Sequence, residues 1–310
     1  MKYFFLCGLL CLNVAAISQT REVCFTIDDL PVVNYGIQEE AYLEGITAQL
    51  ISHFDTYEIP AIGFLNETKL FREGGLSSFQ LKLLEMWLKN GYELGNHTYS
   101  HMNYHAATFE DYTADIIKGE KESRPLIEKY GQELKYFRHP YLRVGLTKEK
   151  HDSLTQFLEQ NGYEEAPVTI DNDDYLFAKA YHEALVMQDS ATMSKIGKDY
   201  INYMEEKIHY FEGASQKLWN RNIKHILLLH ANKLNADYLD ELAAMYQKNG
   251  YDFISLKEAL TDPVYQQEIS RYGDWGISWV DRWALSMGKK GDFFKDDPTT
   301  PEYVKELAAQ

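Results

Sequence analysis

The sequence predicts an α/β fold in which about seven strand–helix units close, or nearly close, into a distorted (β/α)7 barrel. Short apolar runs rich in β-branched and aromatic residues alternate with longer amphipathic stretches. This alternation favours parallel strands joined by helical crossovers. The 310 residues are 45% hydrophobic and 14% aromatic, so the chain can bury a large core. An open, doubly wound sheet is the competing arrangement.

The predicted strands are the short apolar runs, and the predicted helices are the amphipathic stretches between them. We expect strands at Val23–Ile27, Ala61–Leu65, Tyr92–Gly95, Tyr136–Arg138, Pro167–Ile170, His225–His230 and Phe253–Leu256. We expect helices at Glu39–Tyr57, Ser77–Lys89, Phe109–Tyr130, Thr147–Asn161 and Ala236–Asn249. Within the second of these helices, Leu81, Leu84 and Leu88 recur at helical spacing.

Residues 1–18 have the features of a secretory signal peptide. Lys2 precedes a mostly apolar run from Tyr3 to Ile17, which ends in small residues. The sequence therefore predicts an exported protein, periplasmic or secreted, with a retained anchor as the alternative. After cleavage Cys24 would be alone, so we expect no internal disulfide and a Cys24 that is buried and unreactive.

Two segments lie outside the strand–helix alternation. The predicted barrel domain covers residues 19–262, and residues 175–222 within it are too long for one crossover, so they predict a helical insertion. Residues 263–310 form a C-terminal extension rich in tryptophan. Three of its tryptophans, spaced by four, would share one face of a helix and pack the extension onto the barrel: Trp275, Trp279 and Trp283. An exposed aromatic platform for a sugar ring is the alternative.

The charge of the chain excludes two classes of partner. Lys and Arg number 31 against 47 Asp and Glu, which gives a net charge of −16. An acidic surface repels phosphate backbones, so we predict no nucleic-acid partner. Beyond the first twenty positions no run of eighteen apolar residues occurs, so we predict no integral membrane domain.

Ionisable residues follow the predicted strands, where a barrel of this kind places its working groups. They are Asp28, Asp29, His97, His101, Arg138, Asp171, Asp173, Asp174 and His230. Each alone has a structural interpretation: a helix cap, a solvated histidine pair, or a hydrogen-bonded core histidine. Together they offer two imidazoles and one carboxylate as metal ligands, with a further carboxylate and a further histidine as base and acid. That set is what a catalytic zinc site with an open position needs.

Five separated motifs carry these residues. They are Thr26-Ile27-Asp28-Asp29, His97-Thr98-Tyr99-Ser100-His101, Arg138-His139-Pro140-Tyr141, Asp171-Asn172-Asp173-Asp174-Tyr175 and Leu228-Leu229-His230. In their order and placement the sequence resembles the polysaccharide deacetylase family, with its NodB homology domain (carbohydrate esterase family 4). The resemblance spans roughly residues 21–260 and implies a NodB-type barrel, with the helical insertion and the C-terminal extension outside it.

The resemblance implies a metal site formed by Asp29, His97 and His101. Zn²⁺ is the expected ion, and Co²⁺, Ni²⁺ or Mn²⁺ would suit the same ligands. We do not expect His105 or His139 to be ligands. A third imidazole from His105 would over-fill the site, and His139 occupies the variable position of its motif.

The resemblance also implies the residues that handle protons and charge. Asp28 would be the general base for the attacking water, and Arg138 would keep it ionised and oriented. The backbone N–H of Tyr141 would stabilise the oxyanion of the tetrahedral intermediate. His230 would protonate the leaving group.

A carboxylate is expected to keep that histidine charged. Asp174 matches the family position for it, with Asp171 and Asp173 as alternatives.

The function that these inferences predict is an exported, metal-dependent hydrolase that removes acetyl groups from a carbohydrate. An N-acetylglucosamine-containing glycan is favoured, so the bond cleaved would be a carbon–nitrogen bond other than a peptide bond. An O-acetyl esterase of the xylan type would use the same residues, since both reactions pass through a tetrahedral intermediate. Another C–N hydrolase of this fold and a catalytically idle sugar-binding module are the remaining alternatives.

Overall fold

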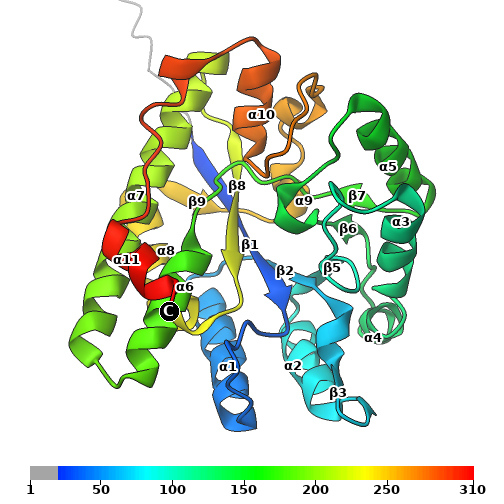
Figure 1. Ribbon diagram of the computed structural model, residues 1–310, viewed down its shortest axis with the longest axis vertical. Helices are drawn as coiled ribbons and strands as arrows, with labels where there is room; N and C mark the ends of the chain where they lie inside the picture. Colours follow the sequence, from blue (N-terminus) through cyan, green and yellow to red (C-terminus); the bar gives the residue numbers. More distant parts are fainter. Residues whose placement is uncertain (1–19) are drawn as a thin grey trace, which may run out of the picture.

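The computed structural model describes residues 20–310, and a curled, seven-stranded parallel sheet lies at its centre (Figure 1). Six strands follow the order β7-β6-β5-β2-β1-β8, and β9 also pairs with β1. They are β1 (Arg21–Leu30), β2 (Ile62–Leu65), β5 (Glu93–Asn96), β6 (Tyr136–Phe137), β7 (Glu164–Glu165), β8 (Lys224–His230) and β9 (Tyr251–Phe253). A separate antiparallel hairpin pairs β3 (Phe71–Arg72) with β4 (Gly75–Leu76).

Strand β1 is the centre of the sheet because both of its edges are paired. Along one edge it pairs with β8 from Glu22 to Asp28, which brings Asp28 level with His230. Along the other edge it pairs first with β9 and then, from Thr26 onward, with β2. All of these pairs are parallel, so the carboxyl ends of the strands meet at one edge of the sheet.

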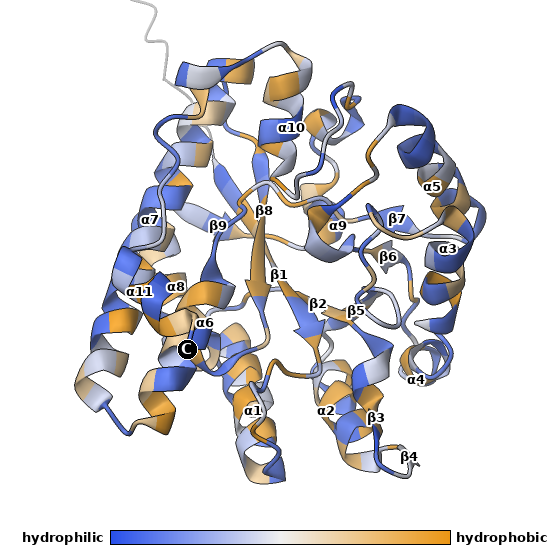
Figure 2. Ribbon diagram, viewed as in Figure 1, coloured by the Kyte–Doolittle hydropathy of each residue, from blue (hydrophilic) through white to orange (hydrophobic). Residues whose placement is uncertain are grey.

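Helices surround the sheet and bury their apolar faces against it. They are α1 (Glu40–Thr56), α2 (Ser78–Lys89), α3 (Phe109–Lys118), α4 (Ser123–Lys129), α5 (Lys148–Gln160), α6 (Asp174–Val186), α7 (Ser190–Trp219), α8 (Lys233–Lys248), α9 (Leu256–Ala259), α10 (Trp279–Ser286) and α11 (Glu302–Ala308). Figure 2 shows the central strands as hydrophobic and the outer helices as striped, which is the amphipathic pattern of helices packed on a sheet. The predicted α/β fold, a distorted (β/α)7 barrel, is therefore confirmed, and its curled sheet forms a half-barrel.

One predicted strand, Pro167–Ile170, is wrong as a regular strand. The structure has a single parallel bridge there, between Ile170 and Leu227. Pro167 has no N–H to donate, and the side-chain oxygen of Thr169 accepts the hydrogen bond of the Ile226 N–H at 2.7 Å. A side chain therefore takes the place of a backbone ladder partner, and the short strand β7 forms the edge beside β6 instead.

The single helix predicted at Phe109–Tyr130 is divided into α3 and α4. Gly119 lies where the chain turns, so close to the loop at Thr98–Tyr99 that an added Cβ would be 2.6 Å from the Tyr99 nitrogen. The buried carboxylate of Glu67 then accepts hydrogen bonds from the N–H groups of Glu122 and Ser123, at 2.8 and 3.0 Å. This carboxylate starts a second helix, because it satisfies N–H groups that a helix leaves unpaired at its N-terminus.

We expect Gly119→Ala to lower the free energy of unfolding by about 1–3 kcal/mol, because the new methyl group would collide with backbone rather than with a flexible side chain. Gly213→Ala is the matched control, since an added Cβ in the middle of α7 would meet nothing within 4 Å. Urea unfolding of both variants measures the difference. Equal free energies of unfolding for Gly119→Ala and the wild type would contradict this prediction, because they would show that the Thr98–Tyr99 loop moves aside without loss of stability.

The predicted helical insertion contains α6 and α7, and the C-terminal helix α11 packs against α6 (Figure 1). In the extension, Trp279 and Trp283 are buried, as the packing interpretation predicts. The prediction that Trp275 shares their helical face is wrong. The helix begins only at Trp279, where Ser278 caps it by accepting the N–H of Asp281 at 3.1 Å.

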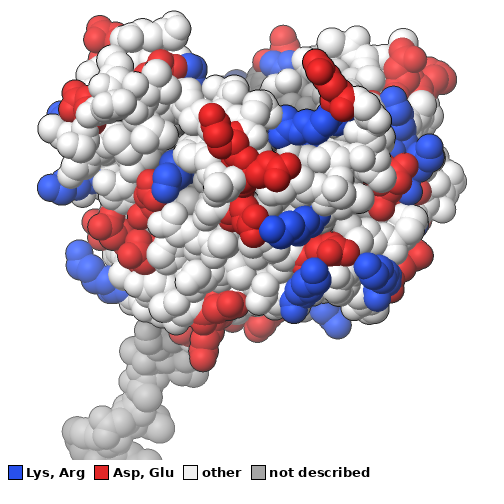
Figure 3. All heavy atoms as spheres, turned by 90° about the horizontal axis from the view of Figure 1, so that it is seen from below, with Lys and Arg blue, Asp and Glu red and all other residues white. Residues whose placement is uncertain are grey.

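Three further expectations concern the chain as a whole. Cys24 is buried and has no disulfide partner in the described part of the chain, and burial raises the pKa of its thiol, which fits an unreactive core residue. Within residues 20–310 no helix is long and apolar enough to cross a membrane. Figure 3 shows one face of the molecule, on which acidic and basic side chains are interspersed. The predicted signal peptide, residues 1–18, lies outside the described residues.

Candidate active site

A pocket of about 600 Å³ opens at the carboxyl ends of the strands. Its floor comes from the end of β1, from the loop after β5 and from the end of β8, which supply Asp28, Asp29, His97, His101 and His230. Its walls carry the tyrosines Tyr35, Tyr141 and Tyr175 together with Arg143, Asp171, Asp173 and Gly276. The parallel sheet therefore gathers side chains from distant parts of the sequence into one pocket, as strand-end placement predicts.

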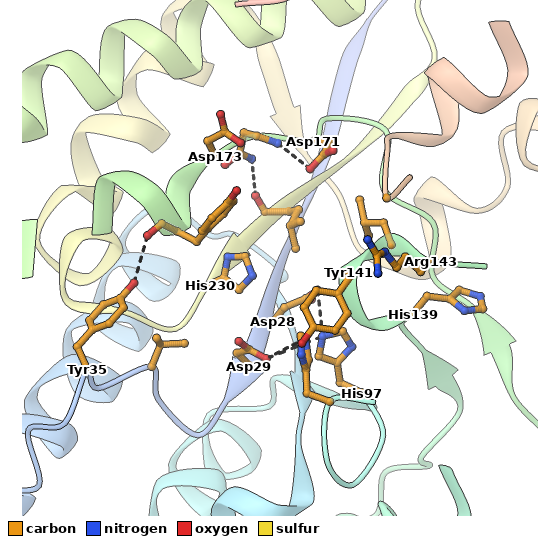
Figure 4. Close-up of a pocket in the computed structure, with 17 residues that line it drawn as sticks. Asp28, Asp29, Tyr35, His97, His139, Tyr141, Arg143, Asp171, Asp173 and His230 are labelled. Atoms are coloured by element: carbon orange, nitrogen blue, oxygen red, sulfur yellow. Dashed lines mark hydrogen bonds and ion pairs between the residues drawn. The ribbon is translucent and has the colours of Figure 1, made fainter. Parts of the chain in front are cut away.

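Asp29, His97 and His101 converge on one point at the floor of the pocket. Figure 4 shows Asp29 beside His97. One ligand atom from each lies within 4.8 Å of the other two. The Asp29 Oδ1 is 3.9 Å from the His97 Nε2 and 3.6 Å from the His101 Nε2. Asp29 Oδ1 is buried and accepts no hydrogen bond from the described residues. An oxygen left unpaired beside two imidazole nitrogens is what a site for a divalent cation provides.

The hydrogen bond on the far side of His97 determines which of its nitrogens faces that point. His97 Nδ1 donates to the carbonyl oxygen of Arg138 at 2.8 Å, and a carbonyl can only accept. The proton of the neutral ring is therefore on Nδ1, and Nε2 presents its lone pair to the pocket. Burial lowers the pKa of His97 well below its usual value, so the ring stays neutral at physiological pH.

Asp28 is buried beside these ligands and is held by Arg138. The guanidinium Nη1 lies 3.1 Å from Asp28 Oδ1 and 3.2 Å from Oδ2. Arg138 is itself fixed by bonds to the Thr26 hydroxyl at 3.0 Å and to the Ala166 carbonyl at 2.7 Å. Burial raises the pKa of Asp28 to about 6 although Arg138 lowers it, so this carboxylate is ionised at pH 7 yet basic enough to take a proton.

His230 lies across the pocket and is paired with Asp174, which is fully buried. His230 Nδ1 donates to Asp174 Oδ1 at 2.6 Å, and the His230 backbone N–H donates to Oδ2 at 2.9 Å. Asn235 also donates to Oδ2, at 2.7 Å. Burial alone would lower the pKa of His230, but the Asp174 carboxylate raises it to about 9. The imidazole is therefore a cation at neutral pH, and Asp174 rather than Asp171 or Asp173 is its partner.

The backbone is unusual at several site residues. Five non-glycine residues here have positive φ: Asp29 (67°), Thr98 (65°), His101 (56°), Tyr141 (57°) and Leu142 (53°). Each such residue costs energy and persists only where surrounding contacts hold it. Strained backbone that gathers around one pocket is typical of a functional site.

Sequence reasoning missed one cation beside the predicted metal ligands. The Lys69 Nζ donates to the backbone oxygen of Asp29 at 2.7 Å and lies 3.7 Å from Asp29 Oδ2. Burial would raise the pKa of Asp29, but Lys69 and His101 hold it below the usual range. Lys69 follows β2 within four residues, so its position after a strand end was the available signal.

The two histidines that we did not expect to be ligands lie outside the converging group. His105 pairs with Asp274 through Nδ1 at 3.2 Å, and His139 lies 3.2 Å from the carboxylate of Glu165 through Nε2. Asp173 accepts the hydroxyl of Thr300 at 2.7 Å. Asp171 lines the pocket, and burial raises its pKa to about 7.

The fold and the site together define a NodB-type half-barrel with a two-histidine, one-aspartate cluster. The model of the polysaccharide deacetylase family matches residues 16–166, which contain the first three motifs. This match confirms, over those residues, the resemblance recognised from the motifs. No curated protein matches the chain significantly.

Solved structures share the fold at low sequence identity. One is a mutant of a carbohydrate esterase family 4 pseudoenzyme from Bacillus anthracis with restored activity; it has a TM-score of 0.50 and 16% identity, and the match covers 78% of this chain and 68% of that one. Another is the chitin deacetylase of the fungal pathogen Colletotrichum lindemuthianum, with a TM-score of 0.51 and 18% identity over 79% of this chain and 89% of that one. Both likenesses concern the fold.

Proposed function

We propose that this protein is an exported, metal-dependent hydrolase that removes acetyl groups from a carbohydrate, with an N-acetylated glycan as the favoured substrate. The observation that carries the proposal is the meeting, in one pocket, of a converging ligand set, a buried base and a charged acid. A sugar-binding module has no need of a buried carboxylate facing a histidine cation. Export rests on the N-terminal segment of the sequence alone.

The residues present fit a divalent metal ion. Asp29 Oδ1 is buried and has no hydrogen-bond donor within residues 20–310, and the tautomer of His97 leaves the Nε2 lone pair directed at the same point. Asp29, His97 and His101 would hold the ion, for which zinc is our first choice. A bound zinc ion would act there as a Lewis acid, making a water molecule more acidic and polarising the acyl oxygen.

The protein residues supply the proton transfers around the acyl carbon. Asp28 would take a proton from the attacking water as the carbon–oxygen bond forms, and Arg138 keeps its carboxylate pointing into the pocket. The N–H of Tyr141 would stabilise the negative charge that develops on the acyl oxygen. His230 would give its proton to the leaving nitrogen as the carbon–nitrogen bond breaks, which releases acetate and a free amine.

The aromatic side chains of the pocket support a sugar substrate. Tyr141 and Tyr175 are about half exposed, and the Tyr35 hydroxyl donates to the backbone oxygen of Tyr175 at 3.3 Å. Exposed aromatic rings offer stacking surfaces for the apolar faces of sugar rings. An O-acetyl ester would pass through the same intermediate, so an acetylated xylan is the second candidate substrate.

Acetate release from a panel of substrates tests the proposal. We expect zinc-loaded protein to release acetate from N-acetylglucosamine oligomers faster than from acetylated xylan, and a chelator to abolish both reactions reversibly. Faster release from xylan would make the protein an esterase. Stoichiometric zinc without acetate from any glycan would overturn the proposal and favour another C–N hydrolase or a binding module.

A further inference from the structure

The C-terminal extension contributes to the pocket, although the five motifs do not include it. Gly276 lines the pocket beside Tyr141 and Arg143. The extension is fixed to the barrel just beyond this point, because the Trp279 N–H donates to the Val168 carbonyl at 2.7 Å. A segment anchored so close to the third motif can determine how that motif is held.

The third motif needs such support because its last residue and the residue that follows it both have left-handed backbone conformations. Tyr141 has φ 57° and Leu142 has φ 53°, and neither is glycine. Within the loop itself, the Leu142 N–H donates to the His139 carbonyl and the Arg143 N–H donates to the Pro140 carbonyl, both at 3.1 Å. Two turn hydrogen bonds offset only part of the cost of two such residues. Contacts from elsewhere in the chain must therefore hold this conformation.

Arg282 of α10 supplies one of these contacts. It is fully buried, and its Nη2 donates to the Leu142 carbonyl at 2.6 Å and to the Trp275 carbonyl at 3.3 Å. One guanidinium nitrogen thereby joins the strained loop to the extension. Burying a guanidinium is costly, and among the described residues its Nε and Nη1 find no hydrogen-bond partner. An arginine buried at such a cost fits a role in fixing the loop.

Gly276 supplies the second contact, because its backbone packs directly against that of Tyr141. An added Cβ would lie 1.8 Å from the Tyr141 carbonyl oxygen, a distance that no side chain can occupy. The backbone of the extension therefore packs directly against the peptide group between Tyr141 and Leu142. Asp274, two residues earlier, lies 3.6 Å from Arg143 and adds an ion pair on the same loop.

We propose that Arg282 and Gly276 are positioning residues: they hold the Tyr141–Leu142 backbone in the conformation in which the Tyr141 N–H stabilises the oxyanion. This inference rests on the proposed function, which assigns that role to Tyr141. It makes the C-terminal extension a working part of the active site, acting through the third motif rather than on the substrate.

Gly276→Ala tests the proposal because the new methyl group must displace the Tyr141 peptide group, while Gly276 itself is exposed and has no positive φ. We expect kcat to fall at least about tenfold while KM and zinc content stay close to those of the wild type. The thermal midpoint is recorded on the same samples, because a clash with backbone also lowers stability. Gly45→Ala is the matched control, since Gly45 is also exposed and an added Cβ there would meet nothing within 4 Å. Wild-type kcat in Gly276→Ala would overturn the proposal.

Arg282→Met supplies a readout that does not depend on turnover. We expect amide hydrogen exchange of residues 139–144 to speed up at least about tenfold in this variant, while exchange in β1 and β8 stays unchanged. Arg282→Lys should restore part of the protection, since an ammonium can still donate to the Leu142 carbonyl. Unchanged exchange at residues 139–144 would overturn the proposal. An inactive wild type would count against the proposed function, and the exchange result would still decide the positioning role.

Discussion

Asp28→Asn is expected to lower kcat for acetate release at least about 100-fold while the protein keeps its metal. The amide has nearly the shape of the carboxylate but cannot accept a proton at neutral pH. Asp28 is not one of the three converging ligands, so its loss should not empty the site. Its pKa of about 6 places it close to the value that suits a general base at pH 7.

The measurement is kcat with zinc content determined on the same samples. Asp252→Asn is the matched control, because Asp252 is an exposed aspartate on β9, away from the pocket. The substitution also leaves Arg138 facing a neutral amide, so the thermal midpoint should be recorded to separate lost folding from lost chemistry. Acetate release at the wild-type rate in Asp28→Asn would remove Asp28 from the role of base.

Asp174→Asn is expected to move the alkaline limb of the pH–rate profile to lower pH. The wild-type limb should lie near the His230 pKa of about 9, because His230 acts only while it carries a proton and loses it as the pH rises. Without the Asp174 carboxylate, the effect of burial dominates and lowers the pKa of His230. At about pH 8 we therefore expect kcat to fall at least about 100-fold, with a smaller loss at lower pH.

The neighbouring substitution Asp173→Asn is the control for this experiment. Asp173 accepts the hydroxyl of Thr300 rather than a proton of His230, so the alkaline limb should stay in place. A limb that moves equally in both variants would mean that the summed negative charge, and not the Asp174–His230 bond, sets the pKa. A limb unmoved in Asp174→Asn would remove His230 from the role of acid.

Much of the barrel and the site follows from local patterns in the sequence. The apolar runs at Val23–Ile27 and His225–His230 correspond to β1 and β8, because buried parallel strands are continuously hydrophobic. Residues that follow such strands meet at one edge of the sheet, which is why Asp29 and His97 could be placed together from their positions alone. Asp174 could be matched to its role only by resemblance, and only the structure shows that it contacts His230.

The features that could not be predicted depend on contacts between distant segments. The break between α3 and α4 arises because the Glu67 carboxylate accepts the N–H of Ser123, and no local sequence pattern predicts this long-range contact. Arg282 looks like an ordinary charged residue of an amphipathic helix until its bond to Leu142 is visible. The tryptophan spacing predicted a longer helix than exists, because a periodic pattern does not show that the helix begins only after the cap at Ser278.

The zinc content of the purified protein, measured by elemental analysis beside His97→Ala, tests the central claim of a metal-dependent site most directly. His105→Ala is the control, because His105 pairs with Asp274 outside the ligand group. We predict about one zinc ion per chain in the wild type and in His105→Ala, and its loss in His97→Ala. A zinc-reconstituted wild type that binds no metal, or an His97→Ala variant that keeps it, would contradict this account.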